Sequence, residues 1–300
     1  MTVLAFSWTE FAQQVVSGLA TGAIYGSLAL ALVLIYRSTD VVNFAQGEMA
    51  MFTTYIAWEL MHKGVSYWPA FVLTLLIAFA GGVTIERVLI RPVEQAPPLA
   101  IVIVTIGLLI AINGLAGWIW TAEVKPFPSP FPNRAVEIGG VALSIQDIGT
   151  FGVCVGTVIL LWAFFNLTSL GLAMRAVAIN PTASRLVGVR VGWMLALGWG
   201  LAAVLGAVAG MMAAPTVFLD PNMMLTILVY AFAAAVLGGI DSPVGAVVGG
   251  LTLGVLVNLL DTYVSAVSNE LRLPAAFAIL LAVLMVRPAG LFGHVVVRRV

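Results

Sequence analysis

Charged residues are scarce in this chain. Only 9% of its 300 residues are Asp, Glu, Lys or Arg, whereas 62% are hydrophobic, and the mean hydropathy is +1.11. Soluble domains carry about 25% charged residues, so a soluble fold of this composition could not cover its own surface with polar groups. A lipid bilayer solvates apolar side chains, and the composition therefore predicts an integral membrane protein.

Cysteine and histidine are also rare. The single cysteine, Cys154, cannot form an intramolecular disulfide and is expected to be a small buried or lipid-facing side chain. The two histidines, His62 and His294, lie far apart, so no zinc site is predicted. The formal net charge is zero, which gives no field to attract nucleic acid, and no nucleic-acid partner is expected.

The chain also lacks a phosphate-binding loop of the form G-x-x-x-x-G-K-[ST]. Its only lysines are Lys63, which precedes Gly64, and Lys125, which precedes Pro126. We therefore expect no catalytic residues, no metal and no cofactor on this chain. If the protein uses ATP, another chain must hydrolyse it.

Long apolar runs are what the sequence does contain. A membrane-crossing helix needs about 20 mostly apolar residues, and nine runs qualify: 11–36, 41–61, 68–90, 99–120, 148–167, 195–218, 224–240, 244–262 and 272–288. The first is too long for the core of a secretory signal. We predict an all-α, polytopic bundle of about nine spans (range eight to ten), forming a single transmembrane domain over residues 1–300.

Two parts of this assignment leave room for alternatives. Polar residues interrupt 41–61, and Asp241-Ser242-Pro243 is the only break between 224–240 and 244–262. Either two spans meet at that break, or one helix is broken at membrane depth. The segment 121–147, with four prolines, is expected to be an extracytoplasmic loop.

The basic residues predict the orientation, because Lys and Arg favour cytoplasmic loops. If Arg37 lies inside and the spans alternate, nine arginines are cytoplasmic and four basic residues are outside. The cytoplasmic set is Arg37, Arg87, Arg91, Arg175, Arg185, Arg190, Arg287, Arg298 and Arg299; the outer set is Lys63, Lys125, Arg134 and Arg272. The N-terminus is then outside and the C-terminus cytoplasmic.

Glycines recur at four-residue spacing, which lets helix backbones approach closely in a membrane. The first helix carries Gly18, Gly22 and Gly26 on one face. The same spacing relates Gly152 to Gly156, Gly206 to Gly210, Gly245 to Gly249, and Gly250 to Gly254. The pattern predicts a tightly packed bundle.

A cytoplasmic segment, residues 168–194, contains signals for a short helix. Asn180 is a favoured N-cap, Pro181 is favoured at the first helical position, and Gly188 can end the helix. Ala183, Leu186 and Val187 then share one apolar face, flanked by Arg185 and Arg190. Such a helix either lies on lipid headgroups or docks into a cytoplasmic partner, and the residues alone favour neither.

Polar residues inside a membrane are energetically costly, so they usually bond to one another or serve a function. Asn43, Gln46 and Glu48 open the second run, where Thr39 or Asp40 could cap the helix. Glu48 should face either a partner helix, through a hydrogen bond, or a water-filled path. Asn113 and Asn258 are expected to join helices.

Several segments, taken in order, resemble one known family. They are Asn43-Phe44-Ala45-Gln46-Gly47-Glu48, Ile85-Glu86-Arg87, Arg91-Pro92-Val93, Gly171-Leu172-Ala173-Met174-Arg175-Ala176, Ala235-Val236-Leu237-Gly238-Gly239-Ile240, Pro243-Val244-Gly245-Ala246 and Arg287-Pro288-Ala289-Gly290-Leu291-Phe292-Gly293. The chain resembles, over residues 11–293, the membrane permease subunits of branched-chain amino acid ABC importers. It is most similar to the shorter of the two permeases that such systems pair.

The resemblance implies a set of partners in a bacterial inner membrane. A second related permease would lie beside this chain, two ATP-binding subunits would dock on the cytoplasmic side and bind ATP and Mg²⁺, and a periplasmic binding protein would deliver the substrate. The helix at 181–187 would be the coupling helix. Thr182 stands where the family loop has Glu, so Thr182-Ala183 with Gly188 is a degenerate EAA…G motif.

The translocated solute would be a branched-chain amino acid or a related amide or urea. We predict that Asn43, Gln46 and Glu48 line its path, and that Gly238 and Gly239 let a helix bend or approach. The rival hypotheses are an ion-coupled secondary transporter, for which only Glu48 is a candidate ionisable group, and a channel, which needs a polar ring along a pore.

Overall fold

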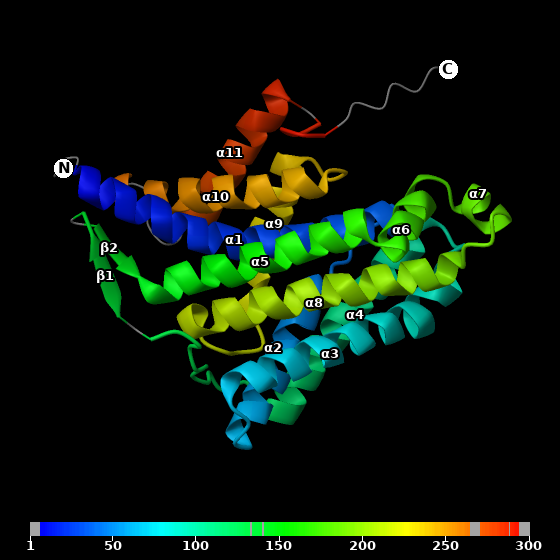
Figure 1. Cartoon of the computed structure of the whole chain (residues 1–300), viewed down its shortest axis with the longest axis horizontal. Helices are drawn as coiled ribbons and strands as arrows, with labels where there is room; N and C mark the ends of the chain where they lie inside the picture. Colours follow the sequence, from blue (N-terminus) through cyan, green and yellow to red (C-terminus); the bar gives the residue numbers. More distant parts are fainter. Residues whose placement is uncertain (1–6, 133, 140, 265–270, 288, 294–300) are drawn as a thin grey trace.

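The computed structural model describes residues 7–132, 134–139, 141–264, 271–287 and 289–293. Eleven α-helices run through this part of the chain (Figure 1). They are α1 (Trp8–Thr39), α2 (Gln46–His62), α3 (Tyr67–Ile85), α4 (Pro98–Trp120), α5 (Ile145–Leu167), α6 (Ser169–Ile179), α7 (Pro181–Leu186), α8 (Val191–Val217), α9 (Met223–Gly238), α10 (Pro243–Tyr263) and α11 (Arg272–Val286). A π-helical turn (Glu86–Ile90) and a 3-10 turn (Arg91–Val93) extend α3.

All nine predicted spans coincide with helices, which confirms the polytopic bundle. Six of the described helices are long and apolar enough to cross a membrane: α1, α3 with its extension, α4, α5, α8 and α10. The other three, α2, α9 and α11, are shorter, at 17, 16 and 15 residues. The sequence did not predict the hairpin of β1 (Ala135–Ile138) and β2 (Val141–Ser144), which pair antiparallel just before α5.

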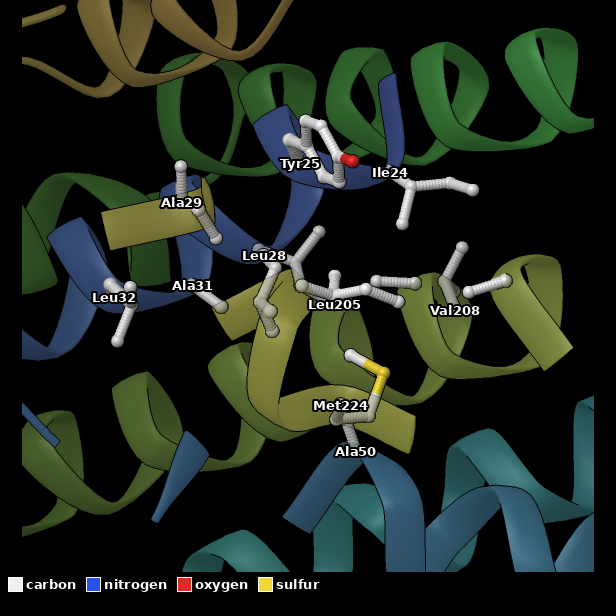
Figure 2. Close-up of a cluster of buried hydrophobic side chains, with 14 of the residues drawn as sticks. Ile24, Tyr25, Leu28, Ala29, Ala31, Leu32, Ala50, Leu205, Val208 and Met224 are labelled. Atoms are coloured by element: carbon white, nitrogen blue, oxygen red, sulfur yellow. The ribbon is translucent and has the colours of Figure 1, made fainter. Parts of the chain in front are cut away.

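The core lies where α1, α2, α8 and α9 meet. In Figure 2 the side chains of Leu28, Leu205 and Met224 converge from α1, α8 and α9, and Ala50 approaches from α2. These four residues are fully buried or nearly so. Many of their neighbours are alanines, whose small side chains let four helices share one core.

Glycines bring α1 and α10 into backbone contact, as predicted. A Cβ added at Gly22 would lie 2.8 Å from the carbonyl oxygen of Gly250, and one added at Gly18 would lie 2.7 Å from the Cα of Val255. Gly18 meets Val255 and Gly22 meets Gly250, so residue numbers rise on α1 as they fall on α10, and the two helices are antiparallel. Gly206 and Gly210 of α8 make similar contacts with α2. A Cβ added at Gly152 or Gly156 of α5 would have no neighbouring atom within 4 Å, so the prediction of tight packing is wrong for that pair within this chain.

The break at Asp241-Ser242-Pro243 separates two helices that fold back on each other. An added Cβ at Gly238 would collide with the backbone of Gly245, and one at Gly249 would collide with the carbonyl of Ala234. These pairs make α9 and α10 antiparallel. The alternative of one helix broken at membrane depth is therefore excluded.

Basic residues in the described part of the chain lie at both ends of the bundle, and most of them are at one end. The arginine-rich end, on the right of Figure 1, is where α1 and α5 end, α8 begins, and α6 and α7 lie. Arg87 stacks over the Trp193 ring at 3.7 Å, while Arg37 and Arg175 line one cavity. At the opposite end Lys125 lies 5.3 Å from the Trp58 ring, near Lys63 at the end of α2.

Candidate functional site

The segment 168–194, which we call the coupling segment after the role predicted for it, is held tightly to the bundle. The Thr168 hydroxyl accepts a hydrogen bond from the Gly171 amide at 3.0 Å, capping α6. Gly171 packs against the backbone of Phe164 so closely that an added Cβ would collide with it. Val177 of α6 is buried with Val191 and Leu195 of α8. The segment is therefore packed directly against α5 and α8.

Both predicted ends of α7 are confirmed. The Asn180 side chain accepts a hydrogen bond from the Ala183 amide at 2.9 Å, and Pro181 occupies the first helical position. At the other end Gly188 has φ +85°, and its amide donates to the Arg185 carbonyl. The next amide, Val189, donates to the Ser184 carbonyl, which completes a Schellman motif.

The outer face of α7 is apolar and exposed. Leu186 and Val187 keep 84% and 80% of their surface accessible, and Ile179 at the end of α6 keeps 81%. Thr182, Ala183, Arg185 and Arg190 are exposed as well, whereas Ser184 is buried against the bundle. Figure 1 shows α7 beyond the ends of the long helices, at the arginine-rich end.

The start of α2 differs from the prediction. The helix begins at Gln46 rather than near residue 41, and neither Thr39 nor Asp40 caps it. Asp40, with φ 55°, instead ends α1, and its amide donates to the Tyr36 carbonyl. The chain between Asp40 and Gln46 is non-helical, and much of it is buried among helices. Non-helical backbone is tolerated at membrane depth only when it is enclosed in this way or lines water.

Asn43 and Gln46 tie this segment to α8. The Asn43 amide donates to the Gln46 Oε1 at 3.2 Å, and its own Oδ1 accepts from the Ala45 amide. The Gln46 Nε2 donates to the Ala202 carbonyl of α8 at 2.9 Å. Both side chains are fully buried. Their hydrogen bonds fix where α2 starts.

Glu48 joins α2 to α4. Its carboxylate is 1% exposed, and its Oε2 accepts a hydrogen bond from the Asn113 amide at 3.3 Å. Asn113 also donates to the Pro221 carbonyl at 2.9 Å and to the Asn222 Oδ1 at 3.3 Å, in the turn before α9. The expected helix-to-helix bond of Glu48 is present, and we call Glu48, Asn113, Pro221 and Asn222 the Glu48 node.

The prediction that Asn113 joins helices is confirmed by its hydrogen bond to Glu48. The part that Asn222 plays in this node was not predicted. The signal for Asn113 is that it is the only amide in an otherwise apolar run. No local pattern identifies Glu48 as its partner, because the two residues meet only through tertiary packing. Asn258 likewise joins helices, since its amide donates to the Gln14 carbonyl at 2.8 Å.

Gly238 and Gly239 lie at the end of α9. Gly239 has φ +107°, and added Cβ atoms would meet Gly245 at Gly238 and Gly293 at Gly239. The amides of Leu291 and Phe292 donate to the carbonyls of Leu237 and Gly238 at 2.8 and 2.9 Å. The glycines thus permit close backbone approach at the arginine-rich end.

The five predicted path residues do not form one cluster. Gly47, beside Gln46 and Glu48, packs against Leu228 of α9. Gly238 lies ten residues further along that helix, or roughly 15 Å at its rise per residue. A path that includes both groups would have to run along α9.

Comparison with known proteins decides the family. A family model described as branched-chain amino acid transport system / permease component matches residues 14–287. The chain belongs to this family. It is a membrane-spanning transport permease component, and the rival assignments as an ion-coupled transporter or a channel are not favoured.

Curated relatives match the permease along almost its whole length. It is 31% identical to the high-affinity branched-chain amino acid transport system permease protein BraD of Pseudomonas aeruginosa, over 97% of this chain and 98% of that protein. It is 30% identical to LivH of Escherichia coli, a permease protein of the same description, over the same shares. The solved structure of PsaBC from Streptococcus pneumoniae in complex with Fab aligns with 93% of the permease and 92% of that chain, at 15% identity and a TM-score of 0.49.

Proposed function

We propose that the permease forms the membrane pathway of an ATP-binding-cassette importer for branched-chain amino acids, or for related amides or urea. A second related permease would complete the pathway, two ATP-binding subunits would dock at the arginine-rich end, and a substrate-binding protein would deliver the solute at the other end. ATP and Mg²⁺ would be held by the ATP-binding subunits, since this chain has no G-x-x-x-x-G-K-[ST] loop. The chain itself would bind no cofactor.

The observation that carries the proposal is the exposed face of α7. Leu186 and Val187 present apolar surface at the far tip of the bundle, on a helix that is capped at both ends. The packing of Val177 against Val191 and Leu195 links that helix to α8. Displacement of α7 by a partner would therefore be passed to a helix that reaches the core, which is the kind of coupling that switches a bundle between two arrangements.

The proposed orientation follows from charge. With the arginine-rich end in the cytoplasm of a bacterial inner membrane, the N-terminus lies outside and the C-terminus inside, as the positive-inside rule favours. Arg185 and Arg190 then border a docking surface rather than an outer loop. A docking role for α7 agrees with its place beyond the ends of the long helices (Figure 1) better than a role lying flat on lipid headgroups.

Leu186→Asp tests the proposal. A charge on the docking face should abolish ATP-dependent uptake and prevent co-purification of the ATP-binding subunits, because a desolvated, unpaired carboxylate costs more than the contact gains. The protein should remain in the membrane fraction, since residue 186 is exposed. Leu186→Met, which keeps the apolar surface, should behave as wild type.

Normal uptake by Leu186→Asp would contradict the docking role of α7. Uptake that is insensitive to ATP depletion in the wild type would instead refute the importer itself. The substrate is tested separately, by purifying the complex with its binding protein and measuring whether leucine, an amide or urea is retained.

A further inference from the structure

A cavity of about 510 Å³ lies beside the coupling segment and has no part in the proposed docking of α7. Its walls come from α1, α5, α6, α8 and α10. Most of the lining is aliphatic or aromatic, and its volume falls within the range of small-molecule sites. The cavity therefore has the size and the surface of a binding site for an apolar group.

The cavity is polar at one end only. Its polar lining residues are Arg37, Ser38, Asn166 and Arg175, and all four lie at the arginine-rich end. From Arg37 the wall continues inward to Leu30, roughly 10 Å along α1. On α5 it continues from Asn166 to Val158, roughly 12 Å. The end of the cavity that is lined by the two arginines therefore leads into an apolar part that runs along α1 and α5.

The two arginines at this end of the cavity have no acidic partner among the residues that the structure describes. No Asp or Glu that the structure describes lies within 4.0 Å of either guanidinium, and none lines the cavity. Arg175 is held in place by a hydrogen bond from its Nη1 to the Asn166 Oδ1 at 3.3 Å. An amino acid would find no described carboxylate here to pair with its ammonium group. An anion with an apolar tail fits both parts of the site.

The cavity opens sideways, between α5 and α10. Ile159 and Trp162 of α5 and Val244 of α10 line it and keep 56%, 57% and 60% of their surface exposed. These side chains continue the apolar outer faces of their helices, which lipid can reach when the chain spans a membrane. Tryptophan is also enriched where acyl chains meet headgroups. A ligand can therefore enter from the bilayer.

We propose that this cavity binds an anionic glycerophospholipid, with its phosphate between Arg37 and Arg175 and an acyl chain along Leu30, Leu34 and Val158. Basic pockets between membrane helices are suited to such headgroups. The lipid would fill the space between α1, α5 and α6, directly behind the helix that carries α7. It would thereby brace the coupling segment from inside the membrane.

The test is native mass spectrometry of the full-length permease complex, titrated with phosphatidylglycerol or phosphatidylcholine of identical acyl chains. We expect phosphatidylglycerol to load at least about tenfold more tightly, since each arginine near the membrane surface favours an anionic lipid and two act together. The double variant Arg37→Gln/Arg175→Gln should lose this preference. The double variant Arg37→Lys/Arg175→Lys should keep the preference for phosphatidylglycerol. Arg190→Gln should keep it as well, because this variant removes an exposed arginine from the same end but not from the cavity.

Four results would overturn the proposal. One is equal loading of the two lipids by the wild type. Another is loss of the preference in Arg190→Gln to the same degree as in the double Gln variant. The third is displacement of the lipid by glycerol phosphate, which has the anion without the acyl chain. The fourth is a structure of the assembled transporter with a protein helix in the cavity. Displacement by glycerol phosphate would identify a plain anion site, and the helix would identify a subunit interface.

Discussion

Helices α1 and α3 are equally apolar but have different surroundings. The most apolar window of each has a mean hydropathy of 2.0, yet 83% of the α1 window is buried within the chain against 22% of the α3 window. The α8 window resembles that of α1, with 78% buried, whereas α4 and α5 reach only 28% and 17%. Hydropathy identifies a span, but it does not tell whether the span faces protein or lipid.

The surroundings of the glycines distinguish the buried helices from the outer helices better than hydropathy does. Gly18, Gly22 and Gly26 of α1 each touch the backbone of α10. Gly107, Gly114 and Gly117 of α4 have open space where a side chain would be, as do Gly152 and Gly156 of α5. The packed part of the bundle is therefore the part in which glycines bring backbones together, and the outer faces of α3, α4 and α5 are left for lipid or for another subunit.

The largest effect is expected for Gly22→Leu, which tests whether the glycine contacts hold α1 against α10. Its Cβ would lie 2.8 Å from the Gly250 carbonyl oxygen and from the Leu251 Cα, and backbone cannot move aside as a side chain can. We expect the α1–α10 contact to be lost, at a cost of more than about 3 kcal/mol in the free energy of unfolding. Thermal unfolding in detergent, followed by size-exclusion chromatography, measures the effect.

The matched control is Gly152→Leu on α5. No atom lies within 4 Å of the new Cβ, so the stability of the isolated chain should stay within about 0.5 kcal/mol of wild type. If both variants lose stability equally, the open glycines of α5 are packed after all and the comparison fails. If only uptake by the assembled complex is lost in Gly152→Leu, α5 faces another subunit.

A smaller effect is expected at the Glu48 node, which bridges the packed α2 and the outer α4. Glu48→Ala removes the acceptor for the Asn113 amide and should lower the free energy of unfolding by about 1–3 kcal/mol. Glu48→Gln keeps an acceptor oxygen at that position. It should therefore keep most of the stability and, if the node only joins helices, most of the uptake.

Comparing the two Glu48 variants separates structure from transport. Stability in detergent and uptake in vesicles are measured on the same preparations. Loss of uptake in Glu48→Gln with stability intact would show that the negative charge acts on the substrate. That result would favour the translocation path over the helix-to-helix node.

The smallest effect is expected at α7, which lies outside the packed bundle and relies on local caps. Asn180→Ala removes the acceptor for the Ala183 amide and should destabilise the helix by about 1 kcal/mol. Amide hydrogen exchange of residues 181–189 should speed up while the long helices are unaffected. Asn180→Ser restores a capping oxygen, and unchanged exchange in Asn180→Ala would mean that the cap contributes nothing.

The features that the sequence predicted well depend on local patterns. The nine apolar runs follow from bilayer thickness, and both ends of α7 follow from Asn180, Pro181 and Gly188. The role of Gly18, Gly22 and Gly26 follows from their spacing on one helix face. In each case a few neighbouring residues contain the whole signal.

The features that were missed or wrongly placed depend on distant residues. α2 starts at Gln46 because Ala202 of another helix accepts its side-chain hydrogen bond, and Glu48 finds its donor on α4. Gly152 and Gly156 have the same spacing as the packed glycines but no neighbour. Spacing shows that a face can pack, whereas only the fold shows whether another helix meets it.

The contact between α1 and α10 also constrains how the protein is made. Gly250 lies against Gly26, yet it leaves the ribosome roughly 220 residues later, or roughly 10–45 s at usual elongation rates. Throughout that interval α1 is already inserted with its glycine face unmatched, while the helices from α2 to α9 are still emerging. A nascent chain released before α10 would leave that face open to mispairing, so quality control in the membrane should act most strongly on such unfinished chains.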